Sequence, residues 1–359
     1  MSNVISVEFG ANRSVHKGLV PSVLSQFAKE RCPESSIYWM KENGELLNIL
    51  ESVSCHLGPH DLSVYDGFYQ TLEERLSFFP QYYRFLLSIA QDLEALGMHG
   101  AKSYSMAKWI KSKGLAEAEL SDLQRCEVHR LMSRAGIRPS ADIPAVWSRL
   151  KRFINHKETF AVPNRKAAYE LTHIVFYFSN YGRQDPKLDA EALVSLEYAG
   201  ILAFLDMNVD LLAEVCIAMR FAGMPVNEVW ENWIEGELSE YVFSETHEGL
   251  RADDYHSYFI CNWLRALRGG DVFSNHPLFS KRLRYERPIP SQSPLRLISQ
   301  VILSMNETRR PDWHNMRTFV TEKMSEDTSD FLQTVENSSG RFAEFFCTFS
   351  RSDMVVING

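Results

Sequence analysis

The chain has 359 residues, 45% of them apolar and 23% charged, so it can bury a large core in one or two domains. A formal net charge of −8 provides no general basic field, which argues against a non-specific nucleic-acid or anionic-membrane binder. The N-terminus lacks a signal-peptide pattern, and no apolar run reaches the roughly 20 residues that span a bilayer. We therefore expect a cytoplasmic protein with no nucleic-acid and no membrane partner.

Helical periodicity covers most of the chain after about residue 20. Short apolar stretches at Val4–Phe9 and Met354–Ile357 predict two strands near the two ends of the sequence. Proline and glycine mark the helix boundaries in the first half of the chain. The helices predicted there cover 21–30, 37–54, 65–78, 80–97, 101–113, 117–135 and 145–156.

The pattern becomes more regular after Pro163. Short breaks between helices of similar length indicate antiparallel neighbours, that is, stacked αα-hairpins. The proline-containing stretch that ends at Pro294 is the best linker candidate. The helices predicted in this half cover 165–180, 188–205, 209–222, 225–242, 252–267, 295–305, 311–324 and 328–350.

These elements predict an all-α fold of stacked αα-hairpins with an accessory N-terminal helical region. The hairpins could extend as an open solenoid or close into an α/α-toroid, and no consensus repeat decides between the two. We divide the chain into an N-terminal helical region (1–140), a central region with the candidate site (141–270) and C-terminal helices that pack on it (271–359).

Two segments place a carboxylate three residues before a histidine. They are Glu170 with His173, and Asp253 with His256. Side chains at this spacing share one face of a helix and can converge on one ion or substrate. Acids and histidines on otherwise apolar helices are costly unless they are paired, hydrogen-bonded or bound to a metal.

Three further acids, Asp206, Asp210 and Glu214, lie four residues apart between these segments. In a toroid alternate helices line the inside, so 165–180, 209–222 and 252–267 would share one layer. If they run parallel, their polar residues lie near the same rim, where free helix N–H groups add a partial positive charge.

One interpretation of this group is a divalent metal site. Mixed imidazole and carboxylate ligands suit zinc, iron or manganese. The two carboxylate-x-x-His helices also resemble the spacing in carboxylate di-iron bundles, although one of them uses Asp. The candidate ligands are His173, His256, Asp210, Glu170, Glu214 and Asp253.

A second interpretation needs no metal, because a histidine and an acid can act as a general acid/base pair. The catalytic candidates are His173, His256, Asp210 and Tyr255. A third interpretation is purely structural: acids in a first helical turn are usually caps or dipole partners, and a histidine on an apolar face is usually a hydrogen-bonded core residue.

The segment Tyr169–Tyr177, followed by Tyr181-Gly182 and Asp254-Tyr255-His256, resembles a pattern in bacterial all-helical proteins of unassigned function and α/α-toroid type. The resemblance covers residues 163–268. It implies that His173 and His256 belong to one site, and it implies no particular reaction.

From these patterns we expect an enzyme that acts on a small or medium organic substrate by metal-assisted oxidation, hydrolysis or elimination. A homodimer is compatible with this expectation. The alternative is an α-solenoid interaction module without catalysis. An enzyme should bring His173 and His256 within reach of one ion in a polar pocket, whereas a scaffold should expose a groove of Trp and Tyr.

Overall fold

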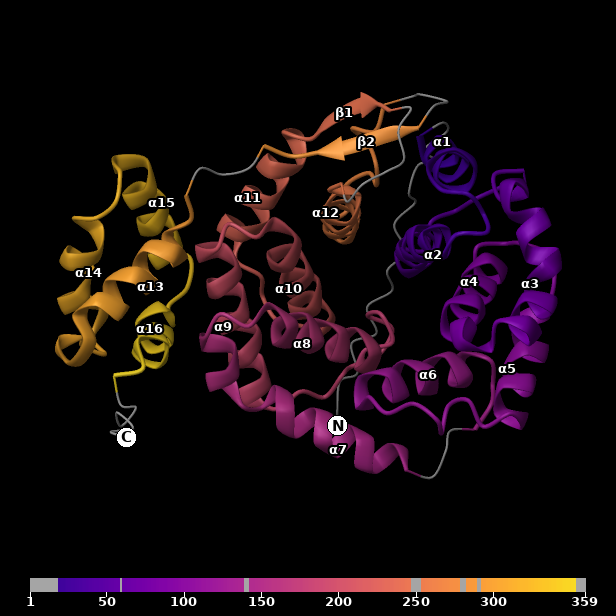
Figure 1. Cartoon of the computed structure of the whole chain (residues 1–359), viewed down its shortest axis with the longest axis horizontal. Coiled ribbons are helices and arrows are strands. Elements are labelled where there is room, and N and C mark those ends of the chain that lie inside the picture. The colour runs from indigo at the N-terminus through magenta and orange to yellow at the C-terminus, as the bar shows by residue number, and fades with distance from the viewer. Residues whose placement is uncertain are drawn as a thin grey trace, which may run out of the picture.

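The computed structural model describes residues 19–58, 60–138, 142–246, 253–277, 282–288 and 292–352. The fold is all-α, as the sequence predicts, with one small two-stranded sheet among the described residues (Figure 1). The first half contains α1 (Leu19–Gln26), the π-helical turn η1 (Phe27–Arg31), α2 (Ile37–Ser52), η2 (Ser63–Tyr65), α3 (Asp66–Phe78), η3 (Pro80–Tyr82), α4 (Tyr83–Ala95), α5 (Lys102–Ser112), α6 (Asp122–Arg134), α7 (Ile143–Ile154) and η4 (Lys157–Ala161).

The five helices predicted between 165 and 267 correspond to α8–α12. Their boundaries follow the breaks seen in the sequence. The second half contains α8 (Arg165–Phe178), α9 (Ala190–Leu205), α10 (Val209–Phe221), α11 (Glu228–Ser239), β1 (Val242–Glu245), α12 (Tyr255–Leu267), β2 (Leu283–Glu286), α13 (Pro294–Met305), η5 (Asn306–Thr308), α14 (Trp313–Thr321), α15 (Glu326–Asn337) and α16 (Phe342–Ser350).

Polar capping residues fix where several of these helices begin. The Ser36 side chain accepts a hydrogen bond from the Tyr38 amide at the start of α2. Asn164 and Asn208 accept in the same way from amides in the first turns of α8 and α10. Such caps satisfy N–H groups that have no partner within the helix, and each contributes about 1 kcal/mol.

Six helices contact one another in the order α2, α4, α6, α8, α10, α12, and α12 contacts α2. Figure 1 shows the chain curving round so that the orange α12 and sheet lie beside the indigo α1 and α2. Helix α10 lies against α8, α9, α11 and α12, and most of its residues are buried. The helices expected to share one layer, now α8, α10 and α12, are therefore direct neighbours.

The two strands differ from those that the sequence predicts. Both predicted strands, Val4–Phe9 and Met354–Ile357, lie outside the described residues. Among the described residues, β1 pairs antiparallel with β2, where Leu283 and Tyr285 are fully buried. The prediction of helix up to residue 242 was therefore wrong at its end. Strands of four residues carry too few positions to reveal a period of two.

The helix predicted over 328–350 is two helices, α15 and α16, with a break between them. The reason is tertiary: the buried Ser338 hydroxyl accepts a hydrogen bond from Trp230 Nε1 at 2.8 Å, and the Ser338 carbonyl accepts from Asn227 Nδ2 at 2.6 Å. Trp230 in turn lies against Gly200 of α9, where an added Cβ would come within 2.5 Å of the indole ring. These contacts dock the C-terminal helices on α9 and α11.

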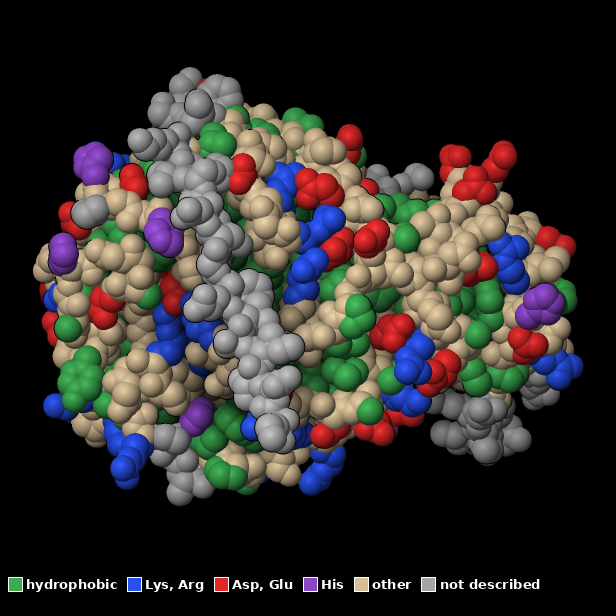
Figure 2. Space-filling view, turned by 180° about the vertical axis from the view of Figure 1, so that it is seen from behind, with side chains coloured by type: hydrophobic (Ala, Val, Ile, Leu, Met, Phe, Trp, Pro, Cys, Tyr) green, Lys and Arg blue, Asp and Glu red, His purple; other side chains and the backbone are tan. Residues whose placement is uncertain are grey.

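On the face shown in Figure 2, acidic and basic side chains are interspersed rather than segregated into one field. Within the described residues, no helix combines the length and the apolar character needed to cross a bilayer.

A buried arginine connects the N-terminal helices to α12 and the sheet. The Arg31 guanidinium donates to both carboxylate oxygens of Glu42, to both of Asp253 and to the Leu283 carbonyl. It also lies 5.0 Å from the centroid of the Tyr255 ring. The Arg31 side chain is not exposed at all, so its desolvation must be offset by these contacts.

We expect Asp253→Asn to lower the free energy of unfolding by about 2–3 kcal/mol, because it leaves a buried cation short of one partner while Glu42 remains. Urea unfolding followed by circular dichroism measures this change. Asp254→Asn is the neighbouring control, since its carboxylate is exposed and accepts a hydrogen bond from the Arg287 amide rather than from Arg31. Equal stability of the two variants would contradict the structural role of Asp253.

His276 adds a pH-dependent contact to the same region. Its Nε2 lies 3.1 Å from Gln26 Oε1 and 2.9 Å from the Tyr285 hydroxyl. Burial lowers the pKa of His276 to about 4, against an opposing hydrogen bond at Pro277, because the charged ring would lose its hydration.

The folded state therefore resists protonation of His276 while the unfolded chain accepts the proton near pH 6.5. The contribution of neutral His276 to the free energy of unfolding should be fully present above about pH 6.5. The free energy of unfolding should fall by roughly 2–3 kcal/mol as the pH drops towards 4. His276→Gln should flatten this part of the stability profile, and His314→Gln, at an exposed position, should leave it unchanged. Urea unfolding at a series of pH values checks the prediction; parallel profiles for wild type and His276→Gln would refute it.

Candidate functional site

Five titratable side chains from four helices meet where α2, α8, α10 and α12 lie together. We call them the acid–histidine cluster: Glu45, His173, Asp210, Glu214 and His256. Asp210 and His256 are each the second residue of their helix, so two helix N-termini open at the cluster. The Asn208 cap fixes the first turn of α10 and with it the direction of Asp210.

His256 lies between carboxylates on both sides of its ring. Nδ1 lies 3.2 Å from Glu45 Oε2. Nε2 lies 3.5 Å from Asp210 Oδ1 and 3.8 Å from Glu214 Oε1. A carboxylate on one ring nitrogen fixes the orientation of a histidine and directs the other nitrogen at whatever lies opposite.

Glu214 brings the two histidines together. Its Oε2 lies 3.8 Å from His173 Nε2, while its Oε1 faces His256. The Thr172 hydroxyl donates to Oε2 as well. The Glu214 side chain is only 2% exposed, so these groups form almost its whole surroundings.

Asp210 is held on one side only. The Tyr169 hydroxyl donates to Oδ2 at 2.5 Å. Oδ1 is buried and has no hydrogen-bond partner among the residues that the structure describes. A buried carboxylate oxygen without a donor is costly, and it marks a place where a proton, water or cation would be stabilised.

The charges of the cluster are strongly coupled. Burial opposes ionisation of Glu214, but His173 and His256 outweigh it and hold the pKa of Glu214 at about 2. Burial also disfavours the charged form of His256, yet Glu214, Glu45 and Asp210 raise its pKa well above the usual value. The pKa of His173 is raised against burial by Glu214. Burial raises the pKa of Asp210, with His256 opposing it.

The two histidines are partly exposed. The His173 side chain is 41% exposed and that of His256 is 35% exposed. Burial is nevertheless the largest single influence on the pKa of each ring. The exposed fractions show that solvent reaches both side chains. A small molecule could therefore reach these rings.

The geometry suits a metal ion. One ligand atom each from Asp210, Glu214 and His256 lie within 4.8 Å of one another, so the three residues could hold an ion. Ligand bonds of about 2.0–2.1 Å place neighbouring ligand atoms about 3.3 Å apart around a tetrahedral ion. The separations of 3.5 and 3.8 Å from His256 Nε2 are close to that value. The mixed nitrogen and oxygen donors match zinc, iron or manganese.

Not every predicted residue lies in the cluster. Asp253 precedes α12 and binds Arg31 instead. The Glu170 carboxylate lies 3.9 Å from Lys166 on a half-exposed face. Asp206 pairs with Arg165. Neither carboxylate-x-x-His segment therefore places its acid with its own histidine, and the arrangement differs from that of a di-iron bundle.

Tyr255 lies beside the cluster, where burial and then the charge of Glu45 raise the pKa of its hydroxyl above the ordinary value. Glu45, Tyr169 and Thr172 belong to the site but were not predicted. Glu45 lies four residues after Lys41, the spacing of an ordinary exposed helix pair, so its sequence context gave no signal. Tyr169 and Thr172 share a face with His173, which could have pointed to them.

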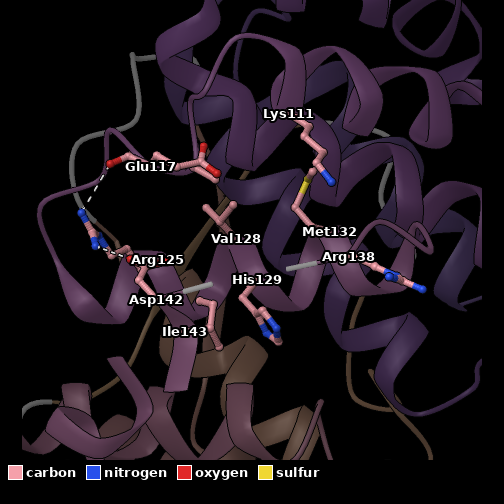
Figure 3. A pocket seen from close by; sticks show the side chains of 10 residues that line it. Lys111, Glu117, Arg125, Val128, His129, Met132, Arg138, Asp142 and Ile143 are labelled. Carbon is pink, nitrogen blue, oxygen red and sulfur yellow. Dashed lines mark hydrogen bonds and ion pairs between the residues drawn. The ribbon is translucent and has the colours of Figure 1, made fainter. Parts of the chain in front are cut away.

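A separate pocket lies between α5, α6 and α7 (Figure 3). Lys111, His129, Met132 and Arg138 line it, and Arg125 at its edge is paired with Asp142. None of the residues of the acid–histidine cluster contributes to this pocket. The two features therefore occupy different parts of the molecule.

Comparison with known proteins gives a family without an assigned activity. No curated protein and no solved structure matches the chain, so no matched relative with an α/α-toroid supports the resemblance seen over 163–268. One family model matches residues 1–352, well beyond that segment. The chain therefore belongs to the family described as a domain of unknown function, DUF6902.

Proposed function

We propose that the protein is a metal-dependent enzyme that acts on a small or medium organic substrate at the acid–histidine cluster. Asp210, Glu214 and His256 are the proposed ligands of a zinc, iron or manganese ion. Glu45 orients His256, and His173 is the proposed general acid/base. The cytoplasmic location, the bacterial origin and the homodimer expected from the sequence stay predictions.

The arrangement around His256 carries this proposal. Glu45 occupies Nδ1, so Nε2 is directed towards two carboxylates. The nearer oxygen, Asp210 Oδ1, is buried, lies 3.5 Å from Nε2 and accepts no hydrogen bond from the described residues. A histidine that binds a metal through one nitrogen and a carboxylate through the other is the usual arrangement in metalloproteins.

The roles of the residues follow from their surroundings. A bound ion would polarise a substrate oxygen or lower the pKa of a water molecule. The ion pair of His173 is with the far oxygen of Glu214, and His173 is the more exposed of the two rings, so it can exchange a proton with a substrate. Tyr169 and Thr172 hold the second oxygens of Asp210 and Glu214 and so fix which oxygen faces the ion.

We also propose that α2, α4, α6, α8, α10 and α12 form the inner layer of an α/α-toroid. The cyclic order of their contacts supports this, as does the alternation with α3, α5, α7, α9 and α11 along the chain. In such an arrangement the exposed parts of His173 and His256 would lie towards the middle of the inner layer. This would agree with a site that encloses its substrate.

The test is the metal content of protein expressed with iron, zinc and manganese supplied, measured by elemental analysis. Wild type should contain close to one ion per chain. His256→Ala and Asp210→Asn should each lose at least about 90% of it, because loss of one ligand weakens such sites by an order of magnitude or more. His173→Ala should keep the ion and lose turnover.

His129→Ala is the matched control. His129 is half-buried on α6 against Trp147, away from any carboxylate of the cluster, and its loss should leave the metal content unchanged. Wild-type protein without metal under all three supplements would remove the metal from the proposal. The general acid/base pair of His173 and Glu214 would then be the remaining basis for catalysis.

The second candidate is an interaction module, and one observation favours it. The end of α3, the turn after it and the first turn of α4 expose aromatic rings, with Phe78 75%, Phe79 41% and Phe85 38% exposed. A cluster of this kind is a usual contact surface for a partner protein. This function becomes the better candidate if the protein binds no metal. Wild type, His173→Ala and Phe78→Ser are then compared in their capture of partner proteins, and loss of a captured partner in Phe78→Ser alone would favour an interaction module.

A further inference from the structure

Helix α6 has two faces with different surroundings. Val128, His129 and Met132 line the pocket between α5, α6 and α7 (Figure 3). Glu127, Arg130 and Arg134 follow the i, i+3, i+7 spacing of the other face. That face contacts α4 and α8, so its charged residues point towards the layer that carries the acid–histidine cluster.

The three charged residues on this face are not satisfied equally. Glu127 pairs with Arg84 of α4. Arg134 binds the buried Asp92 at 2.8 Å and Glu51 at 3.2 Å. Arg130 is only 6% exposed, yet its Nε and Nη1 atoms have no hydrogen-bond partner among the described residues, and it forms no ion pair with them.

Two tyrosine rings hold the Arg130 guanidinium. Its Cζ lies 4.6 Å from the centroid of the Tyr181 ring and 6.0 Å from that of Tyr177. Tyr181 stacks in turn on Trp263 of α12. Contacts with ring faces fix the orientation of a guanidinium but do not satisfy the N–H groups at its edge.

A buried guanidinium with free N–H groups is expensive, and proteins usually supply a carboxylate to it. Arg134, one turn further along the same helix, is paired with two carboxylates. The fork of Arg130 matches an oxyanion, to which guanidinium groups donate paired hydrogen bonds. We infer that Arg130 is an oxyanion-binding residue that recognises a carboxylate or phosphate group of the substrate.

The position of Arg130 connects it to the cluster. The Tyr177 ring centroid lies 6.1 Å from that of His173 and 6.0 Å from Arg130 Cζ, so the guanidinium is no more than about 12 Å from the His173 ring. One organic molecule of small or medium size can span this distance. The inference rests on the proposed function in assigning the oxyanion and the reacting group to the same substrate.

The ion pairs differ between the two places. Glu45, Asp210 and Glu214 repel an anion at the cluster, whereas none of the described acidic side chains forms an ion pair with Arg130, and Glu127 on the same face is paired with Arg84. The substrate class is therefore an organic anion whose carboxylate or phosphate lies at Arg130 and whose reacting part lies at His173.

The test is calorimetric titration of the full-length, EDTA-treated protein with inorganic phosphate and, in a separate arm, with malonate. Wild type should bind at least one of the two. Arg130→Gln should raise the dissociation constant at least about tenfold, because a charged hydrogen bond contributes that much or more. Tighter binding of inorganic phosphate would indicate a phosphate group in the substrate, and tighter binding of malonate would indicate a carboxylate group.

Arg152→Gln, an exposed arginine on α7, is the control for loss of one positive charge and should bind like wild type. If Arg130→Gln loses its helical circular dichroism, Arg130→Lys replaces it. That variant keeps the charge without the fork and should bind at least about threefold more weakly. Binding of neither probe by wild type, or equal binding by wild type and the folded Arg130 variant, overturns the inference.

Metal is absent from this titration, so the result does not depend on the ligands of the ion. If the protein has no metal site but binds a probe in a way that depends on Arg130, the metal proposal fails and the oxyanion site at Arg130 stands. A protein that holds the ion but binds neither phosphate nor malonate would support the metal site and overturn the oxyanion site.

Discussion

The buried Arg31 guanidinium is the interaction on which the geometry of the site depends. It joins Glu42 on α2 to Asp253 just before α12. Three residues further along each segment come Glu45 and His256, whose contact orients the histidine. The Arg31 contacts therefore fix the position of α2 relative to α12, and this position brings Glu45 next to His256. The cost of burying Arg31 makes other packings of the two segments unfavourable.

The carboxylates around Arg31 form one layer of charge, and those of the acid–histidine cluster form a second. The two layers differ in the cations that neutralise them. In the first, Glu42 and Asp253 are neutralised by a cation that is part of the chain and always charged. In the second, the ion pairs that the described residues give Asp210 and Glu214 are with imidazole rings, which are cations only while protonated. The second layer can therefore exchange a proton for another cation, and the first cannot. This difference separates a structural charge network from one that can take part in chemistry.

The sequence was informative wherever a pattern extends over many residues. Apolar periodicity located α8–α12, and the rarity of acids and histidines on such helices singled out His173, Asp210, Glu214 and His256. Glu45 could not be found, because it lies in an ordinary amphipathic helix and reaches the site only through the α2–α12 contact. Asp253 has the right spacing to His256, but α12 begins two residues later, so the helical geometry that would align them does not apply.

Tertiary contacts explain the other differences. The break between α15 and α16 is held by Trp230 and Asn227, more than a hundred residues away, and no local signal predicts it. Strand β2 lies in a proline-containing stretch that resembles a linker, yet it is fixed by Arg31 and Asp253. In both places the local sequence permits several structures, and a distant side chain selects one of them.

The contact between Glu45 and His256 spans 211 positions of the chain. A ribosome that adds roughly 5–20 residues per second needs about 10–40 s to proceed from one to the other. During that interval the nascent chain exposes the surface of α2 that α12 later covers. The cluster can thus form only after α12 has been synthesised, and its formation reports that the central helices have been completed and joined to the first.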